Sequence, residues 1–129
     1  MNLKRTLYIL AAVVLIGLSS CLGSKTGKLT VECVPLIGET VDVNGMKVEL
    51  HTNAAFNFPV MTTNMFGSAI LSSAQFLEID PNTYYCRAWK DVNANSIVDP
   101  GDIYAFHTEP IEVLKGDKLI ITMEAYLVK

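Results

Sequence analysis

The chain has few of the residues on which catalysis and nucleic-acid binding most often depend. Its 129 residues include two histidines, three cysteines and one tryptophan, and 10 basic residues against 13 acidic ones give a net charge of −3. Without an excess of positive charge, we expect no nucleic-acid partner. Neither a G-x-S-x-G nucleophile turn nor a phosphate-binding P-loop occurs. The sequence also lacks a long amphipathic helical pattern, which favours a protein built from strands.

The residues that could serve an enzyme lie in strand-like patterns. His51 and His107 alternate with apolar neighbours, and a zinc site built on them would need further ligands that the sequence does not mark. Cys33 and Cys86 have hydrophobic neighbours, which disfavour a reactive thiolate. We therefore expect no enzyme. A small hydrolase that uses paired carboxylates is the catalytic alternative.

The N-terminus has the pattern of an export signal. Two positive residues, Lys4 and Arg5, precede an uncharged apolar run from Leu7 to Leu18. That run is too short for a spanning helix, which needs about 20 residues, but it suits the hydrophobic region of a signal peptide. We expect residues 1–20 to be removed as a signal peptide.

The residues that end this segment, Leu18-Ser19-Ser20-Cys21, resemble the lipobox of bacterial lipoproteins. The resemblance implies cleavage before Cys21, a lipid on its sulfur, and a membrane-anchored position in the bacterial cell envelope. The anchored protein would face the periplasm from the outer membrane or lie at the cell surface. Residues 21–28 then form a flexible tether, and residues 29–129 form the folded body. An ordinary signal peptide or an uncleaved anchor is the alternative.

Two cysteines remain once Cys21 is assigned to the lipid. An oxidising location would permit a disulfide between Cys33 and Cys86. The alternative is two buried free thiols, which pack as small hydrophobic side chains. The sequence leaves both readings open.

Short alternating segments separated by turn signals predict an all-β body. In the clearest of them, Tyr84, Cys86 and Ala88 share an inward face, and Asn44-Gly45 predicts a hairpin turn. The expected strands cover residues 28–34, 41–43, 46–52, 56–63, 68–73, 75–79, 83–90, 103–113 and 118–128.

The segment from Thr62 to Ala88 resembles the transthyretin-like, carboxypeptidase-regulatory-type β-sandwich. The likeness rests on a Thr-rich turn with Asn and Gly and on a later turn with Pro, Thr and Tyr, filled here by Thr63, Asn64, Gly67, Pro81, Thr83 and Tyr84. It implies an antiparallel, immunoglobulin-like sandwich of about seven strands. Folds of this kind host many functions, so the resemblance implies no activity.

The stretch DVNANSIVDPGD, residues 91–102, has oxygen-bearing side chains at alternating positions. An EF-hand-type loop supplies calcium ligands from positions 1, 3, 5, 7, 9 and 12. Hard oxygen ligands of this kind suit calcium better than magnesium or a soft metal. The alternative is a polar turn without a metal. Counted from the first Asp, the ligand positions are Asp91, Asn93, Asn95, Ile97 through its backbone carbonyl, Asp99 and Asp102.

Two residues depart from the EF-hand pattern. Ser96 stands where EF-hands carry Gly, and Asp102 stands where they carry Glu. Because no helices flank it, the loop resembles instead the calcium loops between strands of secreted bacterial β-sandwich modules. That resemblance implies a structural calcium ion.

The strand before the loop has a second face, formed by Tyr85, Arg87 and Trp89. An exposed aromatic and Arg patch of this kind could bind a sugar or a protein. The alternative is that Trp89 covers the sheet edge or packs on the loop.

These observations predict a lipid-anchored, calcium-stabilised β-sandwich module of the bacterial envelope, with a binding or structural role and an unknown protein or carbohydrate partner. Three alternatives remain. They are a carbohydrate-binding or adhesion module with an exposed aromatic face, a subunit assembled through an exposed strand edge, and a small envelope hydrolase.

Overall fold

A computed structural model describes residues 25–129 of the chain. The expected signal peptide, residues 1–20, and the expected lipidated Cys21 lie outside the described residues. The body is all-β, as predicted, and residues 25–129 contain no helix that is long and apolar enough to cross a membrane. The strands are β1 (Gly27–Pro35), β2 (Lys47–His51), β3 (Met61–Asn64), β4 (Phe66–Gly67), β5 (Ser72–Ile79), β6 (Asn82–Lys90), β7 (Ile103–Phe106), β8 (Ile111–Val113) and β9 (Lys118–Leu127).

The structure has nine strands, more than the seven or so that the resemblance implied, and their division differs from the expected segments. Residues 103–113 form β7 and β8, and both halves pair with β6. The break lies at residues 107–110 and includes Pro110, whose ring nitrogen has no hydrogen to give to a ladder. β4, with two residues, is a further short strand that the sequence pattern does not indicate.

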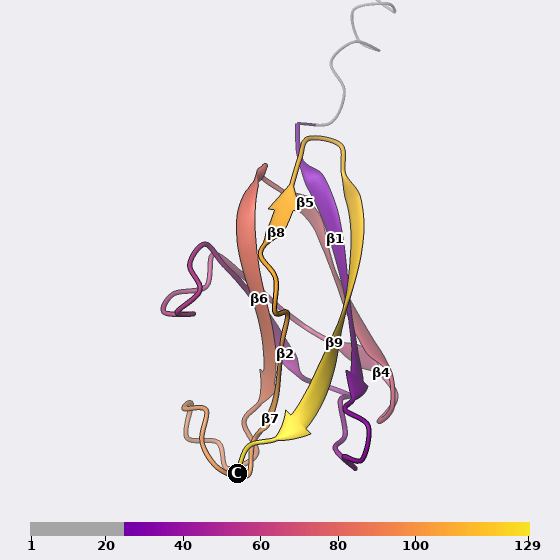
Figure 1. Ribbon diagram of the computed structural model, residues 1–129, viewed down its shortest axis with the longest axis vertical. Helices are drawn as coiled ribbons and strands as arrows, with labels where there is room; N and C mark the ends of the chain where they lie inside the picture. Colours follow the sequence, from indigo (N-terminus) through magenta and orange to yellow (C-terminus); the bar gives the residue numbers. More distant parts are fainter. Residues whose placement is uncertain (1–24) are drawn as a thin grey trace, which may run out of the picture.

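The strands form one curled sheet in the order β3-β2-β6-β7-β9-β1-β5-β4, with β8 beside β6 (Figure 1). The two ends of this path, β3 and β4, are joined by the single residue Met65, whose side chain is fully buried. The N–H of Met65 donates to the Met46 carbonyl over 2.8 Å. The sheet therefore nearly closes into a barrel-like sandwich around one core.

The pairing of β1 with β9 corrects the expectation of a wholly antiparallel sheet. These two strands run parallel, from Lys28 opposite Lys118 to Pro35 opposite Ala125. Figure 1 shows them side by side along the length of the molecule. Parallel strands need a long connection, and here almost the whole body lies between them.

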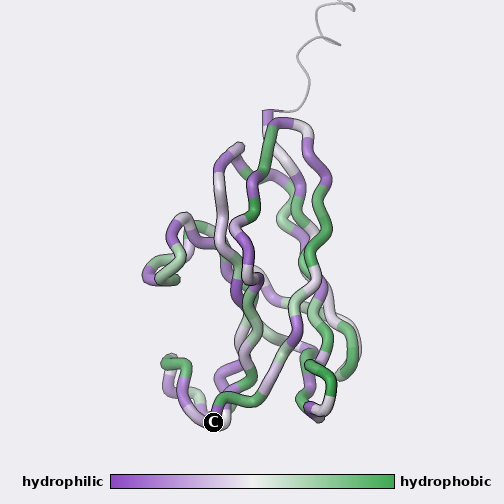
Figure 2. Tube along the Cα trace, in the orientation of Figure 1, coloured by the Kyte–Doolittle hydropathy of each residue, from purple (hydrophilic) through white to green (hydrophobic). Residues whose placement is uncertain are grey.

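Alternating residues of the strands form the core. On β6, Tyr84, Cys86 and Ala88 are buried, which confirms the predicted inward face. Figure 2 shows the same alternation as changes of colour along the strands. The core is completed from the other long strands, with Leu29, Val31 and Cys33 on β1, Val48 and Leu50 on β2, Ala74 and Phe76 on β5, and Met123 and Ala125 on β9.

Two local predictions were wrong. Asn44 and Gly45 form a turn, with Gly45 at a φ of 77°, but residues 41–43 are not a strand, so no hairpin forms. The N–H of Val43 donates instead to the Ala69 carbonyl, 3.0 Å away, and this contact ties the segment to the start of β5. Strand β1 begins at Gly27, within the segment that was expected to form the tether.

Candidate functional site

The loop of residues 91–102 connects β6 to β7. Its ends are held side by side, because Lys90 pairs with Ile103 in the antiparallel ladder. Near its C-terminal end, the Gly101 N–H donates to the Val128 carbonyl and the Val128 N–H donates to the Asp102 carbonyl. The base of the loop is therefore fixed by β6, β7 and the end of the chain.

The first half of the loop is wound around the carboxylate of Asp91. Its Oδ1 accepts the N–H of Asn95 at 3.2 Å, and its Oδ2 accepts the N–H of Ser96 at 2.6 Å. Ala94 and Ser96 both have positive φ values, of 58° and 64°. Left-handed conformations at these alternate residues turn the chain tightly around one centre.

Four of the predicted ligands meet at that centre. Asn93 Nδ2 donates to Asp99 Oδ1 over 2.9 Å, and Asn95 Nδ2 donates to Asp99 Oδ2. Asn95 also accepts the N–H of Ile97, and Asp91 bonds the backbone around it. The structure thus brings Asp91, Asn93, Asn95 and Asp99 together.

The other two predicted ligands lie differently. The Asp102 side chain is fully buried beneath the loop, where it accepts the N–H groups of Val92 at 2.9 Å and Asp99 at 3.0 Å. Ile97 points its side chain outward, with 64% of the residue exposed, as expected for a position that contributes a carbonyl. Asp102 therefore supports the loop from below.

The residues of the loop fit a calcium ion by their chemistry. Carboxylate and amide oxygens are hard ligands, and rotating an amide exchanges its nitrogen and oxygen, so Asn93 and Asn95 can present oxygen where they now donate to Asp99. Residues 25–129 contain no group of three or more His, Cys, Asp or Glu side chains placed to hold a metal. The convergent set depends on amides, which explains this result without excluding the ion.

The predicted ligand face on β6 is not an open aromatic patch. Trp89 is only 6% exposed, and its Nε1 donates to Glu49 Oε1 over 3.2 Å. Tyr85 and Arg87 are partly buried. The Trp89 indole is held against the Glu49 carboxylate on the neighbouring strand β2.

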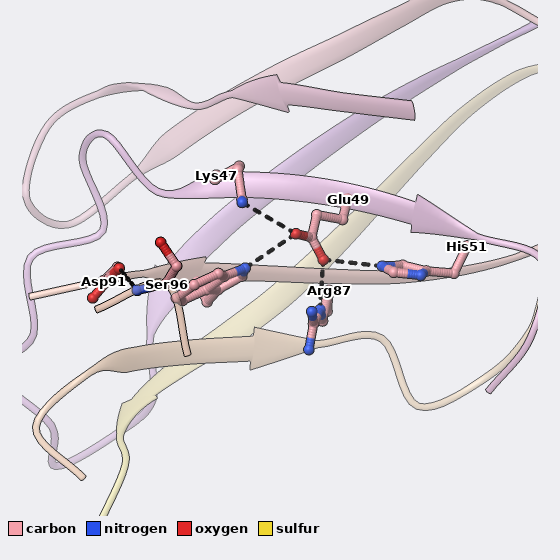
Figure 3. Close-up of polar contacts among 7 residues, drawn as sticks. Lys47, Glu49, His51, Arg87, Asp91 and Ser96 are labelled. Atoms are coloured by element: carbon pink, nitrogen blue, oxygen red, sulfur yellow. Dashed lines mark hydrogen bonds and ion pairs between the residues drawn. The ribbon is translucent and has the colours of Figure 1, made fainter. Parts of the chain in front are cut away.

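Trp89 is buried because it belongs to a cluster of polar and aromatic side chains on β2 and β6 (Figure 3). We call this the Glu49 cluster, and its members are Lys47, Glu49, His51, Arg87 and Trp89. The ladder places Lys47 opposite Trp89 and Glu49 opposite Arg87. Glu49 is 3% exposed and accepts Arg87 Nε at 2.6 Å, while Lys47 Nζ lies 3.3 Å from its other oxygen. Cross-strand pairing thus surrounds one buried carboxylate with donors.

The hydrogen-bond donors around Glu49 favour its ionised form. Burial alone would raise its pKa, but hydrogen bonds from Arg87, His51 and Trp89 and the positive charge of Arg87 lower the pKa from 4.5 to about 2. An ionised carboxylate only accepts hydrogen bonds, so His51 donates through Nε2, 3.0 Å away. Within residues 25–129, the other ring nitrogen of His51 has no partner, which suits the bare lone pair of that tautomer.

The loop between β2 and β3 covers the Glu49 cluster. The Phe56 ring meets His51 edge-on at 5.1 Å, and Arg87 lies over the same ring at 5.5 Å. Phe56 has a positive φ of 52°, which a bulky side chain rarely adopts. The Glu49 cluster is not among the sites predicted from the sequence. Its signal was the complementary spacing of Lys-x-Glu-x-His on β2 and Tyr-x-Arg-x-Trp on β6.

The remaining candidates are structural. Cys33 and Cys86 are both fully buried free thiols, so the disulfide left open by the sequence is not formed. Burial raises the pKa of each thiol to about 12. His107 Nδ1 lies 2.7 Å from the Glu109 carbonyl in the break between β7 and β8, which is a local contact.

A small pocket lies between the Glu49 cluster and the loop. Its volume is about 290 Å³, and its walls come from both features: Gly45, Lys47, Trp89, Lys90, Asp91 and Ser96. Comparison with known protein families, curated proteins and solved structures finds no match to this chain. The resemblances read from the sequence therefore stay predictions.

Proposed function

We propose that this protein is a lipid-anchored, calcium-stabilised β-sandwich module of the bacterial envelope that binds or supports a partner and performs no catalysis. One observation carries the calcium part of the proposal: the side chains of Asp91, Asn93, Asn95 and Asp99 meet in one tight loop. The anchor rests on the sequence pattern that ends at Cys21.

Asp91, Asn93, Asn95 and Asp99 would hold the ion, with the carbonyl of Ile97 as a fifth ligand. Calcium, when bound, would supply positive charge that offsets the repulsion between the carboxylates of the loop. Asp102 keeps its place below the loop and fixes the backbone at Val92 and Asp99. The ion thereby stabilises the crossing from β6 to β7, which also positions the rim of the adjoining pocket.

A carbohydrate-binding role is the second candidate, favoured by that pocket. Trp89, Lys47 and Lys90 line a space of about 290 Å³, close to the lower size of small-molecule sites. Lys47 Nζ also lies 4.8 Å from the centre of the Trp89 ring. A sugar bound there would touch the loop as well, at Asp91 and Ser96.

Thermal unfolding tests the calcium proposal. All nine strands lie between Gly27 and Leu127, so protein of residues 22–129 retains the described fold. At 10 mM calcium and a dissociation constant of about 10⁻⁴–10⁻³ M, linkage raises the free energy of unfolding by about 1.4–2.7 kcal/mol. We expect the Tm to rise by at least about 5 °C over its value in chelator.

Two variants make this test specific. Asp91→Asn with Asp99→Asn removes two charges with little change of shape and should abolish the calcium shift. Asp80→Asn, an exposed acid in another turn, is the matched control and should keep the full shift. If calcium leaves the Tm of the native protein unchanged, the loop is a polar turn and the metal proposal is wrong.

A separate experiment tests the anchor. Expressed in a Gram-negative host, the full-length chain should enter the membrane fraction and carry acyl chains on Cys21, seen by mass spectrometry. Cys21→Ala should leave the protein outside that fraction. Membrane association that persists in this variant would contradict the lipoprotein proposal and favour an uncleaved anchor.

A further inference from the structure

One edge of β9 has no partner strand over most of its length. On one side, residues 118–125 pair with β1 (Figure 1). On the other side, only Tyr126 and Leu127 pair, with Tyr104 and Ile103 of β7. β8 lies on that side as well, but its ladder is with β6. Within residues 25–129, no strand therefore pairs with the second edge of residues 118–125.

The backbone groups on this edge are identified by the ladder. The Lys28 N–H donates to the Asp117 carbonyl and the Leu36 N–H donates to the Ala125 carbonyl. In a parallel ladder, alternate residues face the partner, so the odd-numbered residues of β9 face β1. The even-numbered residues, from Lys118 to Glu124, present their N–H and C=O groups at the free edge.

This edge lacks several of the usual protections against strand pairing. Natural edges are blunted by Pro, by bulges, by charged side chains or by a covering segment. Of the charged residues in this stretch, Lys118 lies at one end and Glu124 near the other, and the residues between them carry no charge. Residues 118–125 contain no Pro, and their register with β1 is unbroken. A groove of about 480 Å³ adjoins the C-terminal half of the edge, and its lining includes Phe106, Thr122 and Glu124. Ile120, in the middle of the edge, is 69% exposed.

We infer that β9 pairs with β9 of a second copy of this chain, antiparallel, about a two-fold axis at Ile121. That register is the one that sets Lys118 opposite Glu124 of the second copy, and symmetry repeats the pair. An axis at Ile120 would place Lys118 opposite Thr122, and an axis at Thr122 would place Glu124 opposite Ile120. Only the register at Ile121 pairs the two charges.

The same register satisfies the backbone and the apolar side chains. The backbone N–H and C=O groups at the edge belong to Lys118, Ile120, Thr122 and Glu124. Each of these residues lies opposite another of them in the second copy, so each facing pair exchanges two backbone hydrogen bonds. Ile120 lies diagonal to its own copy, within reach of side-chain contact. Leu119 and Ile121, which are only partly buried at the margin of the core, gain cover from the second copy.

The dimer is independent of the calcium proposal and has a defined orientation. β1 begins beside Lys118, so each tether leaves near that end of β9. Antiparallel pairing puts the two tethers at opposite ends of the paired strands. If both copies are anchored in one membrane, the strands lie along its surface.

Sedimentation equilibrium of the full-length chain, in detergent matched to the solvent density, tests the inference. We expect a dimer that dissociates on dilution. Lys118→Glu and Glu124→Lys each place like charges opposite one another twice, and each should weaken association by at least about tenfold. The double variant Lys118→Glu, Glu124→Lys restores the pairs in reversed polarity and should recover the dimer.

Two further variants separate edge pairing from charge effects. Thr122→Pro removes an N–H at the free edge, where the fold tolerates Pro, and should abolish the dimer. Glu78→Lys changes an exposed acid on β5, across β1 from β9, and should leave the dimer unchanged. Fluorescence of the single tryptophan during urea unfolding confirms that each variant is folded.

Three outcomes would overturn the inference. A native chain that stays monomeric at the highest soluble concentration has no such interface. A dimer that tolerates both single reversals and Thr122→Pro is formed by another surface. Single reversals that weaken the dimer without recovery in the double variant rule out the register at Ile121.

Discussion

The buried carboxylate of Glu49 makes a sharp prediction about acid stability. Glu49 is 3% exposed and accepts hydrogen bonds from Arg87, His51 and Trp89. Replacement by Gln keeps the size of the side chain but removes the charge that these donors face. We expect Glu49→Gln to destabilise the protein near neutral pH and to have little effect in strong acid.

The magnitude follows from the pKa of the folded protein. Although burial opposes ionisation, the donors and the charge of Arg87 lower the pKa of Glu49 from 4.5 to about 2. A lowered pKa means that folding favours the ionised form, so this stability is complete above pH 4.5 and is lost as the pH falls through about 2. The lowered pKa of Glu49 corresponds to about 3 kcal/mol in the free energy of unfolding at pH 7 and to under about 1 kcal/mol at pH 2.5.

Urea unfolding followed by the fluorescence of Trp89 measures this directly, because the indole itself donates to Glu49. The free energies of unfolding of the native protein and of Glu49→Gln are compared at pH 7 and pH 2.5. Glu112→Gln, an exposed acid on β8, is the control and should change neither value by more than about 0.5 kcal/mol. A gap between the native protein and Glu49→Gln that is equal at both pH values would refute the reasoning.

Three other features give predictions of the same kind. Because burial raises the pKa of the Cys33 and Cys86 thiols to about 12, both should resist iodoacetamide at pH 8 in the folded protein and react in urea. Mass spectrometry counts the labelled thiols, and rapid labelling without urea would contradict their burial. Ser96→Gly relieves a left-handed residue and should raise the free energy of unfolding by about 1 kcal/mol in urea titrations; no gain would show that the loop stores no strain there. Gly67→Ala would place a methyl group against the Leu71 carbonyl oxygen and should lower that free energy by about 2 kcal/mol or more, whereas an unchanged midpoint would show that the β4 turn can shift.

Alternation along each strand was enough to predict the core. Tyr84, Cys86 and Ala88 are buried because strand side chains alternate between faces, and a two-residue period needs no knowledge of neighbours. The same period correctly placed Trp89 on the opposite face of β6. It does not show which residues cover Trp89, because burial on that face depends on contacts with Glu49, 40 residues away, and with Lys47.

Contacts between residues that are distant in the sequence explain the predictions that were wrong. The parallel pairing of β1 with β9 joins the two ends of the body, and no local turn encodes it. At Asn44-Gly45 the turn itself was predicted, yet Val43 bonds to Ala69 instead of forming a hairpin strand. In the loop, by contrast, the ligand pattern is local. The spacing of Asp91, Asn93 and Asn95 therefore predicted which side chains meet, while the supporting position of Asp102 required the structure.

The parallel pairing of β1 with β9 also determines how the protein responds to mechanical load. The start of β1 lies at one end of the molecule, and the C-terminus lies beyond the far end of β9, at the opposite end (Figure 1). A pull between these points draws the two strands past each other, so the hydrogen bonds from Lys28 to Pro35 carry the force together. Bonds at a peeled edge would break one after another. A load applied between the start of β1 and the end of β9 therefore acts on the whole ladder at once.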